Sequence, residues 1–151
     1  MGKSLSEVER AYLAGLLDGD GAIMAVIERH PEKRFGFRVR LEINVTQSLR
    51  DDVAWIPDLT GVGYVRRNVR TFQWVVRDQQ AARWLLDMIA PYARTKRNQV
   101  ALAIRILERA INSKEDLFEV AQLADALSKF NIRSNHRRRN HAAMVQGIVL
   151  P

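Results

Sequence analysis

The chain has 151 residues, 47% of them hydrophobic and 27% charged, which fits one globular domain with a sizeable core. The absence of cysteine excludes disulfides, thiolate catalysis and cysteine-based zinc sites, so a metal ion would need oxygen or histidine ligands. The formal net charge is +7, and most of the 24 basic residues are arginines, whose planar forks suit phosphates and guanine edges. Nucleic acid is therefore the leading class of partner, and a basic surface that only aids solubility is the alternative.

The sequence carries no signal for secretion or for a membrane. No apolar run approaches the roughly 18 to 20 residues that cross a bilayer, and the N-terminal segment lacks the apolar core of a signal peptide. We therefore expect an intracellular protein with neither a membrane nor a small-molecule partner, in a cytoplasmic or organellar compartment that the sequence leaves open.

The first predicted element is a helix that begins at a capping box. Ser6 and Glu9 form the pattern S-x-x-E, in which each side chain can accept the other residue's backbone N–H. The helix should run to about Asp18 and end in residues 19–21, where glycine permits the backbone to turn out of the helix.

Two strands should follow, over residues 22–30 and 35–47, with an exposed turn between them. The second strand alternates between apolar and polar side chains, which is typical of a strand with one buried and one accessible face. Its apolar face carries Phe35, Phe37, Val39, Leu41, Ile43 and Val45, and its polar face carries Arg34, Arg38, Arg40, Glu42 and Asn44.

The rest of the chain repeats this order and then becomes helical. A helix over 49–60, which Pro57 can shorten or restart, precedes strands over 64–69 and 71–77. Helices are then predicted over 79–90, 97–111, 114–129 and about 140–147.

This order predicts an α+β fold of the type αββαββα, with one antiparallel four-stranded sheet and additional C-terminal helices. We find neither a linker nor a second copy of any motif in the sequence. We therefore expect a single domain over residues 1–151, of which about 131–151 form a basic C-terminal extension.

The segment LAGLLDGDG, residues 13–21, closes the first predicted helix. Together with GVGYVR and the order of the elements, this segment resembles the LAGLIDADG homing endonuclease family. Leu17 replaces the isoleucine of the family motif and Gly19 replaces its alanine, and the resemblance covers about residues 5–140. It implies a core whose four-stranded sheet binds DNA.

The glycines of this motif predict close packing of the helix. Gly15 and Gly19 are four residues apart, so they share one helix face and allow another backbone to approach closely. A chain with one copy of the motif should obtain the partner helix from an identical chain, as a two-fold homodimer. The expected interface residues are Leu13, Gly15, Leu16 and Gly19. In the alternative interpretation, the glycine pair packs against the chain's own core.

By the resemblance, Asp20 is the metal-binding acid, and the backbone carbonyl of Gly19 is a possible further ligand. A two-fold axis through paired helices would bring two Asp20 carboxylates together, and a divalent cation would offset their repulsion. Oxygen ligands and a phosphate substrate favour Mg²⁺, with Mn²⁺ able to substitute. The alternative is a helix-end acid that faces water. We expect Asp18 to be structural.

Two more residues match catalytic positions of the family. Gln47 ends the second strand and should place a water or a metal ligand, and Lys96 should stabilise negative charge on the phosphate or polarise the attacking water. The alternatives are a polar residue at a strand end and a solvated lysine. Arg50 is a candidate for a second basic group in the site, although the segment between Gln47 and Gly61 is shorter than in relatives.

The polar strand faces form a candidate surface for base contacts, because arginine, asparagine, glutamine and glutamate are the side chains that contact base edges. An ordinary solvated sheet face is the alternative. The expected DNA-contacting residues on this face are Met24, Val26, Glu28, His30, Arg38, Arg40, Glu42, Asn44, Tyr64, Arg66, Asn68, Gln73, Val75 and Arg77.

The basic segment near the C-terminus is the other candidate for DNA contact. Arg137, Arg138 and Arg139 should grip phosphates, unless the segment is a solvated tail. We interpret His136 and His141 as phosphate contacts or surface residues rather than zinc ligands, because no other ligand cluster accompanies them.

The resemblance implies a site-specific homing endonuclease, encoded within an intron, that cuts double-stranded DNA. It would act as a homodimer on a long, nearly palindromic target by metal-dependent phosphodiester hydrolysis, leaving 3′ extensions. The alternatives are an RNA-binding intron maturase and a non-catalytic DNA-binding regulator on the same fold.

Overall fold

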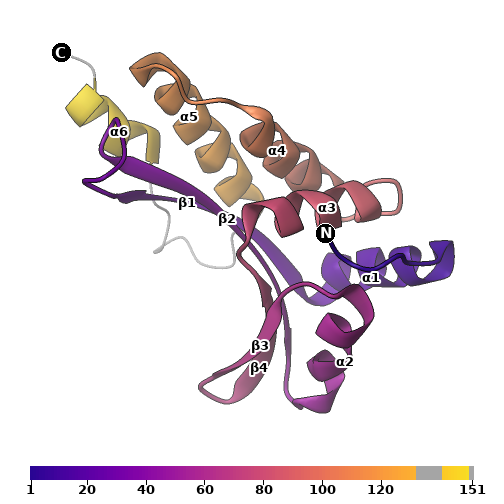
Figure 1. The fold of residues 1–151 in the computed structure, drawn as a ribbon. Helices are drawn as coiled ribbons and strands as arrows, with labels where there is room; N and C mark the ends of the chain where they lie inside the picture. Colours follow the sequence, from indigo (N-terminus) through magenta and orange to yellow (C-terminus); the bar gives the residue numbers. More distant parts are fainter. Residues whose placement is uncertain (132–140, 150–151) are drawn as a thin grey trace.

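A computed structural model describes residues 1–131 and 141–149 (Figure 1). It confirms the predicted order of elements, and most bounds differ from the expected ones by less than one helical turn. The elements are α1 Glu7–Asp20, β1 Gly21–Arg29, β2 Phe37–Gln47, α2 Asp51–Thr60, β3 Tyr64–Asn68, β4 Thr71–Val76, α3 Gln79–Ile89, α4 Arg97–Glu108, α5 Lys114–Phe130 and α6 His141–Val149. Pro57 lies inside α2 without ending the helix.

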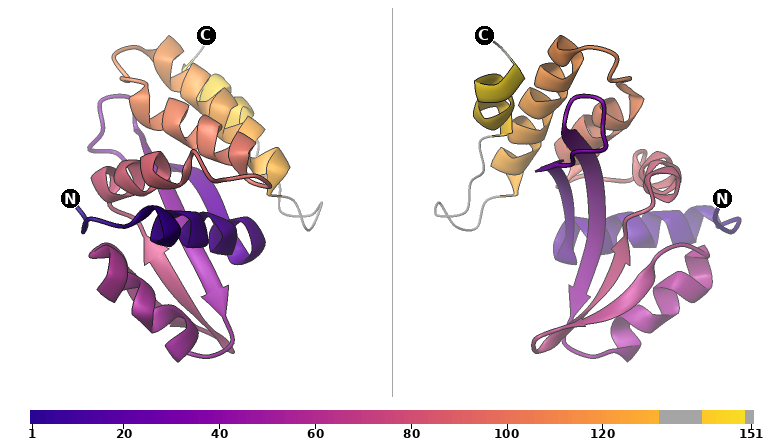
Figure 2. Two further views of the ribbon diagram at one scale, coloured as in Figure 1. Left: turned by 90° about the vertical axis from the view of Figure 1, so that its right-hand side faces the viewer. Right: turned by 60° about the vertical axis from the view of Figure 1, so that its left-hand side comes forward.

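The strands form one antiparallel sheet in the order β1-β2-β4-β3, which confirms the predicted fold class. Helices cover one face of this sheet, and the described residues leave the other face open (Figure 2). The strand register places Met24 beside Glu42 and Arg66 beside Gln73 on this open face. The strand side chains that were expected to contact DNA therefore share one face of the sheet.

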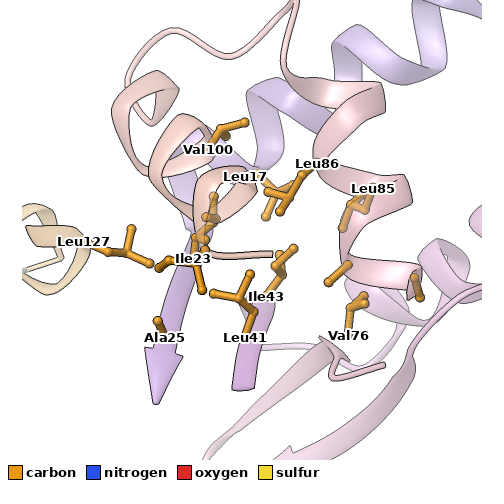
Figure 3. Packing of buried hydrophobic residues seen from close by; sticks show 14 of the residues in the cluster. Leu17, Ile23, Ala25, Leu41, Ile43, Val76, Leu85, Leu86, Val100 and Leu127 are labelled. Carbon is orange, nitrogen blue, oxygen red and sulfur yellow. The ribbon is translucent and has the colours of Figure 1, made fainter. Parts of the chain in front are cut away.

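The core lies between the sheet and the helices. Ile23, Leu41 and Ile43 project from the strands and pack against Leu17 of α1 and Leu85 of α3, all fully buried (Figure 3). Burying a leucine or isoleucine side chain contributes roughly 1.5 to 3 kcal/mol. This packing fixes the position of α1 on the sheet.

Both ends of α1 have a local explanation. The Ser6 hydroxyl accepts the Glu9 N–H at 3.1 Å and the Glu9 carboxylate accepts the Ser6 N–H at 2.9 Å, which confirms the capping box. The helix ends within residues 19–21, as predicted, although two residues beyond Asp18. The Gly21 N–H still donates to the Leu17 carbonyl, so helical hydrogen bonding continues and Asp20 is the last helical residue.

Gly21 is required for close approach rather than for an unusual backbone conformation. Its φ of −97° is accessible to any residue, which differs from the expected role of glycine in this turn. A Cβ at position 21 would lie 2.5 Å from Cδ2 of Leu17 and 2.7 Å from its carbonyl oxygen. Glycine therefore lets β1 begin directly against the last turn of α1.

The GVGYVR segment places β3 in a similar way. Gly63 has a φ of +78°, and a Cβ there would lie 2.4 Å from Nε1 of Trp74. That indole nitrogen donates to the Val62 carbonyl at 3.0 Å. A buried tryptophan and a left-handed glycine thus hold the start of the outer hairpin.

The C-terminal helices pack beside the sheet. Two backbone N–H groups at the start of α6, from His141 and Ala142, donate to the Asp125 carboxylate of α5 at 2.7 and 2.8 Å. His141 is only 4% exposed, so its expected surface or phosphate-contacting role was wrong: the side chain is buried where α6 meets α5. Arg137, Arg138, Arg139 and His136 lie outside the described residues.

Within the described ranges, no helix is both long and apolar enough to cross a membrane.

We expect Ser6→Ala to lower the free energy of unfolding by about 1 kcal/mol, because it removes one side-chain bond of the capping box. Urea unfolding at one fixed protein concentration measures this change. Ser4→Ala is the matched control, since Ser4 is an exposed serine before the helix. Equal stability of the two variants would contradict the role of the cap.

Candidate active site and DNA-contacting face

The end of α1 brings Asp20 and Gln47 together. Asp20 is exposed, and its Oδ2 accepts a hydrogen bond from Nε2 of Gln47 at 2.8 Å. Gln47 is the last residue of β2, and the pairing of Gly21 with Val45 sets that strand end beside the helix end. Two of the three expected catalytic residues are thus in direct contact, although they are 27 positions apart in sequence.

Lys96 reaches the same helix end from the start of α4. Its Nζ donates to the backbone carbonyl of Asp18 at 2.7 Å. This contact places the ammonium group at the last turn of α1, the turn that also carries Asp20. The structure therefore places all three expected catalytic residues at the C-terminal end of α1.

Asp18 holds the loop that carries Lys96. Its two carboxylate oxygens accept the backbone N–H groups of Arg94, Thr95 and Lys96 at 2.9, 3.2 and 3.0 Å. These bonds support the structural role expected for Asp18. They also explain how two segments 76 to 78 residues apart keep a fixed geometry.

The electrostatics of this helix end favour a cation. The C-terminus of a helix carries partial negative charge, and Asp18 and Asp20 add two carboxylates. The last turn of α1 contains no basic residue of its own, so the Lys96 ammonium supplies the nearby compensation from another element. The exposed Asp20 carboxylate is therefore a favourable place for a further positive charge.

The oxygen donors at this point fit a hard divalent ion. Asp20 offers its carboxylate, and Gln47 has an amide oxygen beside the nitrogen that binds Asp20. In the part of the chain that the structure describes, no group of three or more His, Cys, Asp or Glu residues could hold a metal ion. A metal ion at Asp20 would thus take further ligands from water, backbone, phosphate or a second chain.

The outer face of α1 is apolar and open. A Cβ at Gly15 or Gly19 would meet no atom within 4 Å, so the alternative in which these glycines pack against the chain's own core is wrong. Val8 and Tyr12 continue the same stripe and are 79% and 62% exposed. These two residues were missed in the sequence analysis. Positions 8, 12, 15 and 19 nevertheless follow a helical repeat, so the pattern could have revealed them.

Leu13 does not belong to this stripe. It is 0% exposed and packs in the core with Ala14 and Leu17, so its expected place in a dimer interface was wrong. The reason is helical phase, because Leu13 lies one turn before Leu17 on the inward face. Leu16 is half-buried against the core.

The open face of the sheet is less accessible than expected. Tyr64, Asn68 and Arg77 are exposed, whereas the expected residues Met24, Val26, Glu28, His30, Arg38, Arg40 and Arg66 are half-buried. Glu42, Asn44, Gln73 and Val75 are buried, so direct DNA contact by these four side chains is not supported in this conformation. Polar side chains bond to one another across the strands and cover the surface.

Glu28 illustrates these bonds. Its carboxylate accepts a hydrogen bond from Nε of Arg38 at 2.9 Å, and Arg40 lies 3.8 Å away. The hydrogen bond from Arg38 and the charges of the two arginines lower the pKa of Glu28, against the opposing effect of desolvation. Thr46, which sequence reasoning missed, lies on the same face and accepts a bond from Gln73 at 3.0 Å.

Arg50 lies at the N-cap position of α2 and is exposed. No side-chain hydrogen bond ties it to the Asp20 site among the described residues. Its role as a second basic group stays a prediction.

Comparison with known proteins decides the family. The model of a family described as LAGLIDADG endonuclease matches residues 13–106, from the first residue of the motif into α4. The chain belongs to the LAGLIDADG endonuclease family. The resemblance inferred from the motif is thereby confirmed.

Relatives from two algae are similar over most of their length. DNA endonuclease I-CreI of Chlamydomonas reinhardtii is 29% identical over 127 residues, covering 80% of this chain and 77% of the relative. DNA endonuclease I-CvuI of Chlorella vulgaris is 32% identical over 124 residues, covering 79% and 77%.

Solved structures of LAGLIDADG endonucleases share the fold. I-CvuI, crystallised in complex with its target in the presence of calcium, gives a TM-score of 0.84 at 28% identity and covers 94% of this chain and 92% of that one. The archaeal intron-encoded homing endonuclease I-Vdi141I, complexed with DNA, gives 0.81 at 17% identity, with 96% and 99% covered. At 17% identity, the I-Vdi141I structure shows only that the fold is shared.

We expect Asp18→Ala to lower the free energy of unfolding by about 2 kcal/mol. Hydrogen bonds to a charged group contribute roughly 1.5 to 3 kcal/mol, and the Asp18 carboxylate is partly exposed to solvent. Calorimetry measures the change. Asp58→Ala is the matched control, since Asp58 is an exposed aspartate on α2. An Asp18→Ala protein as stable as the control would show that the loop holds Lys96 without this carboxylate.

Proposed function

We propose that this chain is a site-specific DNA endonuclease that acts as a homodimer and uses divalent metal ions to cut both strands of a long, nearly palindromic target. The observation that carries the proposal is the Asp20–Gln47 contact at the end of a helix whose glycine face is open. The family membership and the relatives named as DNA endonucleases support it.

The open face of α1 supports the homodimer. Val8, Tyr12, Gly15 and Gly19 form an apolar stripe that includes two large exposed side chains. Exposed apolar surface of this kind favours association, and the absence of side chains at the two glycines allows two helix backbones to approach. Two-fold packing along this stripe would bring two Asp20 residues, one from each chain, to the middle of the assembly.

The metal site would be built on Asp20. Its carboxylate, with the Gly19 carbonyl or the Gln47 amide oxygen, would hold Mg²⁺, and Mn²⁺ would substitute because both ions prefer oxygen ligands. A bound divalent ion would stabilise the charge that develops on the oxygens of the scissile phosphate. One relative, I-CvuI, was crystallised with DNA in the presence of Ca and in the presence of Mg, in the latter case with uncleaved DNA, which agrees with divalent ions as a class.

The other residues of the site would prepare the reaction. Gln47 fixes the direction of the Asp20 carboxylate through its 2.8 Å bond and would orient the attacking water. Lys96, held against the Asp18 carbonyl, would stabilise negative charge on the phosphate. Each chain would supply one Asp20, Gln47 and Lys96 set, so two sets would cut two strands.

The open face of the sheet would lie along the DNA. Its arginines, Arg38, Arg40, Arg66 and Arg77, have the side chain that most often contacts guanine in the major groove. Arg137, Arg138 and Arg139 would add phosphate contacts, and the whole chain would act as one domain encoded within an intron. An RNA-binding maturase or a DNA-binding regulator without catalysis is not favoured, because the relatives are named as DNA endonucleases and Asp20 keeps its contact with Gln47.

We expect Asp20→Asn to reduce DNA cleavage by about 100-fold or more while leaving target binding largely intact, because the change removes the carboxylate but almost no volume. The measurement is plasmid nicking and linearisation with Mg²⁺ or Mn²⁺, with gel-shift binding in parallel. Equal loss of cleavage and binding would contradict the proposed metal role. A wild-type protein that binds a selected target tightly yet never nicks it would overturn the enzymatic function itself.

We expect Gly19→Leu to shift the protein from dimer to monomer, because the new side chain would stand between the two helices. Gly147→Leu is the matched control, since Gly147 is also an exposed helical glycine with no atom near its virtual Cβ. Sedimentation equilibrium at several concentrations measures the mass. An unchanged mass for Gly19→Leu would refute packing through this face.

A further inference from the structure

The open face of the sheet contains a buried acid. Glu42 of β2 is 7% exposed, and among the described residues it is the one Asp, Glu, Lys or Arg that is buried. A buried carboxylate requires close partners, because burial without them strongly disfavours the charged form. Its partners therefore show why this position is acidic.

Each carboxylate oxygen of Glu42 binds a different arginine. Oε1 accepts from Nη2 of Arg66 at 3.0 Å, and Oε2 accepts from Nε of Arg77 at 3.0 Å. Arg66 comes from β3 and Arg77 follows the end of β4, so the two bonds connect three strands. Because β4 lies between β2 and β3, the Arg66–Glu42 contact crosses over β4.

Further bonds hold Arg66 in place. Its Nε donates to Oε1 of Gln73 at 3.0 Å, and Nε2 of Gln73 donates to the Thr46 hydroxyl at 3.0 Å. We call Thr46, Gln73, Arg66, Glu42 and Arg77 the Glu42 network. It explains why Glu42 and Gln73 are buried on a face that has no helix over it.

In this network the glutamate is buried and the two arginines are partly exposed. The Glu42 side chain is 9% exposed, against 36% for Arg66 and 39% for Arg77. Arg77 uses Nε for Glu42, and a guanidinium has five N–H donors, so other donors of both arginines stay accessible. Desolvation lowers the pKa of Arg77, but the hydrogen bond to Tyr64 and the negative charge of Glu42 outweigh it, so the pKa of Arg77 is raised.

We propose that Glu42 is a positioning residue for sequence-specific DNA binding: its buried carboxylate fixes Arg66 and Arg77 so that their accessible nitrogens face guanine edges in the major groove. This inference rests on the proposed function of the open face. Glu42 itself contacts no base. It acts by ordering two long side chains before DNA arrives and by preventing their mutual repulsion.

The same carboxylate limits binding to the wrong DNA. Two arginines and one glutamate leave one positive charge where the arginines alone would present two. Phosphate attraction depends on charge and is independent of sequence, whereas bidentate contact with guanine depends on geometry. Glu42 therefore weakens the phosphate attraction, which is the same for every DNA sequence. It preserves the guanine contacts, which distinguish one sequence from another.

Glu28 is a more exposed counterpart on the same face. Its side chain is 34% exposed, and both of its arginines, Arg38 and Arg40, come from the adjacent β2. Arg40 lies 3.8 Å from the carboxylate, beyond ordinary hydrogen-bond distance. The Glu42 network differs in span, because it connects β2 with β3 and with the end of β4, whereas the Glu28 contacts join only β1 and β2.

The test compares Glu42→Gln with Glu108→Gln in an Asp20→Asn background, which permits binding to be measured without cleavage. Glu108 is exposed on α4 and pairs with Arg83, so its variant has the same net charge but leaves the sheet unchanged. Binding is selected on randomised DNA, and affinity for random-sequence DNA is measured against salt. Thermal unfolding reports the stability of each variant.

We expect Glu42→Gln to lose at least about fivefold of the base preference at the positions that Arg66 and Arg77 contact, since a bidentate contact accounts for roughly 1 to 3 kcal/mol of discrimination. Affinity for random-sequence DNA should rise, and its salt dependence should steepen by about one, because one anionic group has left the DNA-facing surface. Glu108→Gln should change neither quantity.

A second variant separates position from charge. Glu42→Asp keeps the charge but shortens the reach to both arginines, so base preference should fall while the salt dependence stays that of the parent. In an Arg66→Ala, Arg77→Ala background, Glu42→Gln should alter base preference no further. Unchanged base preference in both Glu42 variants, with only the melting temperature lowered, would overturn the positioning role. If the parent protein itself shows no base preference, the proposed function fails instead.

Discussion

The position of the candidate site depends on α1, which packs one face into the core and leaves another face open to solvent. Leu13, Ala14 and Leu17 anchor one face in the core, while Gly15 and Gly19 leave the backbone of another face accessible. The helix ends at the site itself, so any shift in its packing moves the Asp20 carboxylate. Packing and site geometry are thereby linked in a single element.

The site combines residues from elements that are distant in sequence, and each is tied to the end of α1 by a specific bond. Gln47 binds the Asp20 side chain, and Lys96 binds the Asp18 carbonyl. The Asp18 carboxylate then fixes the loop before α4 through three backbone N–H groups. A helix end with two acids and an external lysine suits a reaction in which negative phosphate and positive ions must meet.

Charge on the open face is organised rather than simply abundant. The net charge of +7 predicts attraction to nucleic acid, but it does not predict which basic side chains contact base edges. The structure shows that Glu28 and Glu42 each hold two arginines on this face. On our proposal, these acids convert a basic surface into one whose affinity depends on the base sequence.

Most of the fold could be predicted because local chemistry decides it. The Ser6–Glu9 capping box begins α1, and the strict alternation of β2 assigns its two faces. The placement of Gln47 at a strand end also followed from pattern and family resemblance together. Leu13 and His141 were misjudged, because motif membership and polarity do not reveal helical phase or burial.

The sequence by itself determined the types and order of the elements, the antiparallel sheet and the family motif, and its resemblance to the family pointed to Asp20, Gln47 and Lys96. Only the tertiary structure decided which polar side chains of the sheet are accessible and which acid holds which arginine. Glu42 meets Arg66 and Arg77, 24 and 35 residues away, because the strand order β1-β2-β4-β3 sets β4 between β2 and β3. Alternation along one strand assigns a side chain to a face, but its partner on that face depends on strand order and register.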